Sequence, residues 1–70
     1  MKQATQAQRL VLNFIKREIK KRGFPPTNAE IQEYFGWGSV MAAQTHLKAL
    51  QRKNYISIEP GVSRGIKVLD

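Results

Sequence analysis

The 70-residue sequence contains no cysteine and a single histidine, His46. Without cysteine the chain has no disulfide framework, no cysteine-based zinc site and no cysteine nucleophile, so packing alone must hold the fold. His46 falls beside an apolar helix face, where a packed imidazole is commoner than a general base. The closest carboxylates, Glu30 and Glu33, are interpreted as a helix-cap residue and a surface charge. We therefore expect neither an enzyme nor a metal or cofactor site.

Long apolar runs are also missing. No stretch approaches the roughly 20 apolar residues that span a membrane, or the apolar core of a signal peptide. A basic amphipathic helix could lie on an anionic membrane, but the basic run from Lys16 to Arg22 has no aromatic anchor beyond Phe14, which falls on the core face. We expect no membrane partner and a cytoplasmic location.

Acidic residues are scarce. Five Asp and Glu stand against 12 Lys and Arg, which gives a net charge of +7 and a pI near 10.3. The hydrophobic share of 41% and the charged share of 24% are ordinary for a folded domain, and 70 residues leave room for only one. The charge predicts a polyanionic partner.

Two capping boxes predict the first two helices. Thr5 with Gln8 begins a helix over residues 6–22, which ends before Gly23. Its predicted apolar face comprises Ala7, Leu10, Val11, Phe14, Ile15 and Ile19. The two prolines after Phe24 cannot continue a helix. Thr27 with Glu30 then begins a helix over residues 28–35.

A third helix and a hairpin complete the predicted fold. After a Gly-Trp-Gly break, in which we interpret Trp37 as a core side chain, Ser39 can cap a helix over residues 40–53 with Ala43, Leu47 and Leu50 on its apolar face. From residue 55 to 69 the period changes to two around a turn-rich tip, which predicts a β-hairpin. The fold class is mainly α with a small β-hairpin, a three-helix winged helix-turn-helix over residues 1–70.

The second helix of a helix-turn-helix enters the major groove of DNA, so its outer face matters most. That outer stripe contains Met41, Gln44, Thr45, Lys48 and Arg52. Gln44 and Thr45 can read base edges, while Lys48 and Arg52 suit phosphates. The alternative is a merely solvated face.

The hairpin tip supplies a second candidate contact. Ser63 and Arg64 could reach the DNA backbone or the minor groove, to which Arg is attracted. The alternative is a surface loop whose Arg only favours solubility. The basic run on the first helix is interpreted as a solvated face, as most such runs are.

Several stretches together resemble the DNA-binding domain of the LexA repressor family. They are residues 23–27 with 29–31, Ser39 with 42–43, 46–50 with 52–53, and 63–66. The resemblance implies a winged helix-turn-helix that represses DNA-damage (SOS) genes in the bacterial nucleoid by binding a palindromic double-stranded operator. It also implies base reading by Ser39, Met41, Ala42, Gln44 and Thr45. The implied backbone contacts are Lys48, Arg52, Lys53, Ser63 and Arg64.

The chain departs from the family pattern within the reading turn. Val40, Met41, Gln44 and Thr45 replace a proline, an asparagine and two glutamates. Methionine cannot pair with a base edge, but its thioether can pack on a thymine methyl, so we expect a changed operator.

Full-length family members carry a self-cleaving, dimerising C-terminal domain that this sequence does not supply. The chain is either a fragment of such a repressor or a stand-alone domain, natural or redesigned. We expect little self-association of the domain alone, with dimers forming on DNA or through the other domain. The rival interpretations are a winged helix that docks an acidic protein and a binder of structured RNA.

Overall fold

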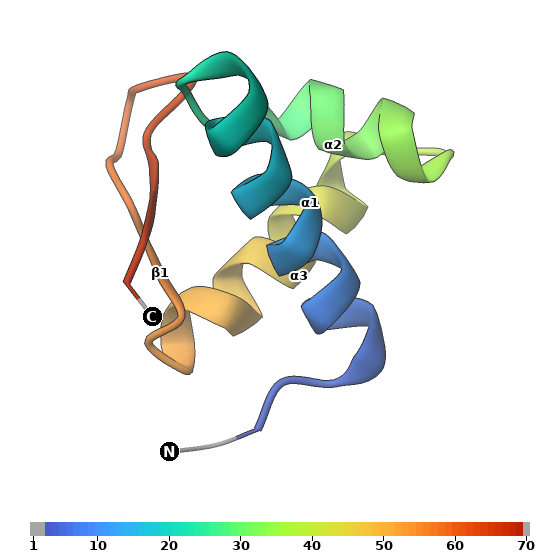
Figure 1. The fold of residues 1–70 in the computed structure, drawn as a ribbon. Coiled ribbons are helices and arrows are strands. Elements are labelled where there is room, and N and C mark those ends of the chain that lie inside the picture. Colours follow the sequence, from blue (N-terminus) through green and yellow to red (C-terminus); the bar gives the residue numbers. More distant parts are fainter. Residues whose placement is uncertain (1–2, 70) are drawn as a thin grey trace.

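The computed structural model describes residues 3–69 as three helices followed by an antiparallel hairpin (Figure 1). The helices are α1 (Gln6–Arg22), α2 (Asn28–Phe35) and α3 (Val40–Arg52), and the strands are β1 (Ile56–Ile58) and β2 (Ile66–Val68). The predicted fold class is confirmed. The third helix ends one residue earlier than predicted, because Lys53 is already its cap.

The predicted caps begin the helices where the sequence places them. Thr5 and Thr27 each accept from the backbone N–H three residues on, and the Gln8 and Glu30 side chains accept in return from the cap N–H groups. Ser39 accepts from the Met41 N–H at 3.1 Å. Gly23 ends α1 in the left-handed conformation, with φ +86°, which costs glycine little.

The core contains side chains from all three helices and both strands. Its members are Ala4, Val11, Leu12, Phe14, Ile15, Ile31, Ala43, Leu47, Leu50, Ile56 and Ile66. The predicted face of α1 was wrong at two places: Ala7 is exposed and Leu10 is 53% exposed. Leu12, on the opposite flank of the same face, is buried instead. Periodicity finds the centre of a helix face, but only the neighbouring elements decide which flank is covered.

The hairpin pairs Ile56 with Val68 and Ile58 with Ile66. Backbone bonds continue past both strand ends, from the Leu69 N–H to the Tyr55 carbonyl and from the Glu59 N–H to the Gly65 carbonyl. At Gly65 a Cβ atom would lie 2.8 Å from the Glu59 carbonyl oxygen. A side chain there would push the two arms apart, so glycine sets the shape of the tip.

The elements are arranged so that α3 is central. It packs against α1 and α2 and continues into β1. In Figure 1 the hairpin lies on the left and α2 on the right, with α3 passing between them. The tip of the hairpin bends back to the turn between α1 and α2, where Arg64 contacts Pro25. The hairpin, which we call the wing, is therefore held at both ends. Its base is joined to α3 by the chain, and its tip contacts the α1–α2 turn.

Candidate nucleic-acid interface

The outer face of α3 is accessible along its whole length. All the side chains of the predicted stripe are exposed, namely Met41, Gln44, Thr45, Lys48 and Arg52. Ala43, Leu47 and Leu50 lie on the opposite face in the core. The predicted division of α3 into a buried and a free face is confirmed.

The hydroxyl groups at the start of α3 are already engaged by the backbone. Ser39 Oγ accepts from the Met41 N–H, and Thr45 Oγ1 donates to the Met41 carbonyl oxygen at 2.9 Å. Thr45 therefore has its hydroxyl proton turned toward the helix and its methyl left for a ligand. Ala42 is half-buried. Within residues 3–69 no hydrogen bond engages the Gln44 amide, which leaves it free to pair with a base edge.

The four cations predicted to contact the DNA backbone form a free pair and a tethered pair. Lys48 and Arg52 are exposed, and neither is hydrogen-bonded or ion-paired in the part of the chain that the structure describes. Lys53 Nζ instead donates to the Gln3 carbonyl at 3.0 Å and to Gln8 Oε1 at 2.7 Å. Its ammonium group fastens the segment before α1 to the end of α3.

Arg64 is the more strongly held of the tethered cations. Its guanidinium donates two bonds to the Glu30 carboxylate, at 2.8 and 2.9 Å, and one to the Pro25 carbonyl at 2.9 Å. It also lies 4.5 Å from the centre of the Phe24 ring, a cation–π distance. The Arg64 bonds, followed by the Thr27 N–H, lower the pKa of Glu30 from 4.5 to about 2. Arg64 thus fastens the wing to the α1–α2 turn.

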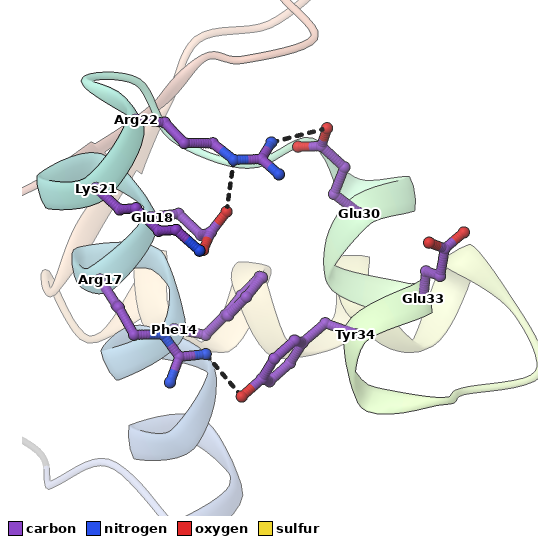
Figure 2. Close-up of a pocket in the computed structure, with 8 residues that line it drawn as sticks. All are labelled: Phe14, Arg17, Glu18, Lys21, Arg22, Glu30, Glu33 and Tyr34. Carbon is purple, nitrogen blue, oxygen red and sulfur yellow. Dashed lines mark hydrogen bonds and ion pairs between the residues drawn. The ribbon is translucent and has the colours of Figure 1, made fainter.

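A charged hollow between α1 and α2 holds part of the basic run on α1 (Figure 2). Arg22 Nε lies 3.2 Å from Glu18 and its NH1 atom 3.7 Å from Glu30. Arg17 donates to the Tyr34 hydroxyl at 2.6 Å. In Figure 2 these side chains reach across from one helix to the other, so both arginines join α1 to α2. Lys20 and Lys21 remain exposed, as a solvated face requires.

A row of aromatic rings links α2 to α3. Trp37 stacks on Phe35 at 4.8 Å and on His46 at 4.6 Å. His46 Nδ1 lies 2.8 Å from the Ala42 carbonyl oxygen, and because a carbonyl only accepts, this nitrogen carries the proton. Both residues have the packed roles that the sequence indicates. Glu30 is also the predicted cap residue, and Glu33 is exposed.

Two features of the site have no signal in the sequence. Glu30 and Arg64 are 34 residues apart, and Lys53 and Gln8 are 45 apart, so no local spacing pairs them. The exposure of Val40 was also missed, but it does have a signal in the sequence. Val40 directly follows the Ser39 cap, where a helix has not yet entered the core. The site residues are otherwise where the pattern predicts, while their contacts with DNA stay predictions.

Within residues 3–69 no helix is long and apolar enough to cross a membrane. In the same residues no three His, Asp or Glu side chains gather as a metal ion would require.

The chain is similar to bacterial repressors over its whole length. The family model described as the LexA DNA binding domain matches residues 1–65. The LexA repressor of Haemophilus influenzae is 50% identical over 70 residues, which are 100% of this chain and 34% of that protein. The LexA repressors of Pseudomonas aeruginosa and Vibrio vulnificus are 50% and 51% identical, over 97% and 99% of the chain and 33% of each relative. The chain spans about a third of the length of these curated relatives.

Proposed function

The chain belongs to the LexA DNA-binding domain family, and we propose from this that it is the sequence-specific DNA-reading module of a transcriptional repressor. In this proposal α3 enters the major groove and the wing lies on the backbone or the minor groove. The observation that carries it is the free outer face of α3, with Gln44 near its start and, towards its end, Lys48 and Arg52, which have no partner within residues 3–69. That order suits base edges first and phosphates after.

The proposed roles follow the position of each side chain. The base-reading group comprises Ser39, Met41, Ala42, Gln44 and Thr45. The backbone group comprises Lys48, Arg52, Lys53, Ser63 and Arg64. In the second group Lys48 and Arg52 are free to move to a phosphate, whereas Lys53 and Arg64 would act from tethered positions and chiefly hold the N-terminal segment and the wing in place.

The similarity to the same relatives supports a proposal for the wider biology. We propose a palindromic double-stranded operator upstream of DNA-damage genes, a bacterial cytoplasmic location at the nucleoid, and repression by occupancy of DNA without catalysis by this module. Two copies would bind the two half-sites of one duplex, since two-fold operators mirror two-fold placement of the protein.

Selection of bound sequences from random duplex DNA tests this proposal. A two-fold-related sequence should be enriched, and its binding should weaken steeply with salt because phosphate contacts release counterions. Gln44→Ala is the matched variant: it should still bind DNA but lose preference at the base pair facing residue 44. No enrichment, or tighter binding to structured RNA or to an acidic protein, would overturn the proposal.

A further inference from the structure

The first two turns of α3 present an exposed apolar surface on the face that we propose to read DNA. Met41 is 68% exposed on this face, whereas Val40, one residue earlier and about 100° around the helix, is 37% exposed and borders the hollow beside the hairpin tip. Neither is needed for the core, which α3 reaches through Ala43, Leu47 and Leu50. A single exposed apolar side chain is common on protein surfaces and does not by itself indicate a binding site. The neighbouring groups decide whether this surface can bind a ligand.

Thr45 extends the apolar surface by one turn. It lies four residues after Met41, so the two side chains are neighbours on one helix face. Its hydroxyl donates to the Met41 carbonyl oxygen, which turns the proton away from any ligand. The methyl group is then the part of the side chain left for a ligand, on the same helix face as Met41. Together Met41 and the Thr45 methyl form what we call the apolar ridge.

Hydrogen-bonding groups are few around the ridge. Ser39 Oγ accepts from the Met41 N–H, which leaves its single hydroxyl proton for a further bond. Ala42 has no polar side-chain atom. Gln44 is exposed, and no hydrogen bond within residues 3–69 holds its amide. Among the five proposed base readers, Gln44 therefore has the only side-chain amide, the group that can donate and accept at the same time to one base edge.

The major groove offers one apolar group for such a ridge, the C5-methyl of thymine. We propose that this chain reads its site chiefly through thymine methyl groups, with Gln44 as the main hydrogen-bonding base reader. This inference rests on the proposed DNA-binding function and names the bases that the same face selects. It predicts half-sites with at least two thymines facing the start of α3.

Deoxyuridine tests the inference, because it removes the methyl and leaves every hydrogen-bonding group of the base pair in place. Each thymine of the duplex obtained by selection is replaced in turn, and binding is measured by fluorescence anisotropy at fixed salt. Replacement at two or more positions within a half-site should weaken binding about four-fold each, the effect of returning one methyl-sized group to water. Replacement outside the half-sites is the control and should have no effect.

Two variants of Thr45 identify the group responsible. Thr45→Val keeps a methyl and removes the hydroxyl, so it should retain both the affinity and one uridine effect. Thr45→Ser keeps the hydroxyl and removes the methyl, so it should bind more weakly and lose that uridine effect. Met41→Asn should likewise lose the uridine effect at the position that residue 41 faces. Circular dichroism checks that each variant keeps its helices.

The outcomes separate the two proposals. If the chain selects a duplex but uridine changes nothing, thymine-methyl reading is wrong and DNA binding stands. Uridine effects confined to bases outside the half-sites would also overturn the inference. So would a Thr45→Val variant that binds as weakly as Thr45→Ser, if the Thr45→Ser variant still shows its uridine effect. If no duplex is selected, the proposed function itself fails and the inference falls with it.

Discussion

At the residue scale, the basic side chains divide by whether a partner already holds them. Lys48 and Arg52 have none within residues 3–69, whereas Arg64 is bound by Glu30 and Lys53 by Gln8. A cation that already has a protein partner must break that hydrogen bond or ion pair before it can bind a phosphate. A free cation needs no such step. The net charge of +7 therefore overstates how many cations are free for the proposed contacts with DNA phosphates.

Removing either free cation should reduce the salt dependence of binding. We expect Lys48→Ala and Arg52→Ala to weaken binding to all sequences alike and to flatten the slope of log affinity against log salt by about one each. Binding titrations between low and moderate salt measure this slope. Lys20→Ala, an exposed cation on α1, is the matched control and should leave it unchanged. A variant at residue 48 or 52 with relaxed base preference would show that its phosphate role is wrong.

The bond between Glu30 and Arg64 should make stability depend on pH. Because the folded pKa of Glu30 is lowered from 4.5 to about 2, the charged carboxylate stabilises the fold above about pH 4.5. This contribution is lost as pH falls from there towards 2. Glu30→Gln can keep the capping box, which accepts Gln at this position, but removes the charge. We expect it to destabilise the fold near pH 6, with a difference from the native chain that disappears towards pH 2.

Urea unfolding at a series of pH values measures that difference. Glu33→Gln, on the same helix and exposed, is the control and should keep the native pH dependence. A Glu30→Gln effect of constant size from pH 6 to pH 2 would contradict an electrostatic origin.

At the element scale, α2 depends most on its ends. It has eight residues, fewer than the 12 or so at which isolated helices become even marginally stable. Ile31 is its fully buried side chain, and Phe35 packs only partly against the core. The cap at Thr27 and the left-handed Gly36 therefore contribute a larger share of its stability than the corresponding ends do in α1.

Loss of the Thr27 cap should be visible in the whole fold. Thr27→Ala removes the acceptor of the Glu30 N–H and should lower the free energy of unfolding by about 1 kcal/mol. Thr27→Ser keeps the hydroxyl and should recover most of this. Chemical denaturation followed by circular dichroism compares them. Equal stability of the Ala variant and the native chain would mean that water replaces the cap without cost.

At the scale of the whole molecule, the wing and the reading helix form one unit. The wing continues from α3 at its base and is bound to the α1–α2 turn through Arg64 at its tip. Strands of three residues would not persist as an isolated hairpin. Their position relative to α3 is therefore set by tertiary contacts, which would let the wing and α3 make the proposed DNA contacts together.

The chain alone should be a monomer that binds a single half-site weakly. Apparent affinity should rise when both half-sites lie on one duplex, because two bound copies then meet at high effective concentration. Sedimentation of the free chain and titrations with one- and two-half-site duplexes test this. A stable dimer in free solution would contradict it, as would equal affinity for the two duplexes.

The sequence by itself determined both ends of α1 and α2, the start of α3 and its free face. Caps such as Thr5 with Gln8 act within one turn, and the period that buries Leu47 and exposes Lys48 is a property of the helix itself. The hairpin and its turn-rich tip were predictable for the same reason. Local geometry depends on neighbouring residues, so a single sequence contains it.

Only the tertiary structure decided which flank of α1 is covered and which cations are free. Leu12 is buried and Leu10 exposed, although both flank the same apolar face. Arg64 meets Glu30 across 34 residues, and its role as a clamp follows from where the wing tip lies. Such contacts depend on the relative placement of whole elements, which is set by the sum of many packing interactions and by no pattern within one segment.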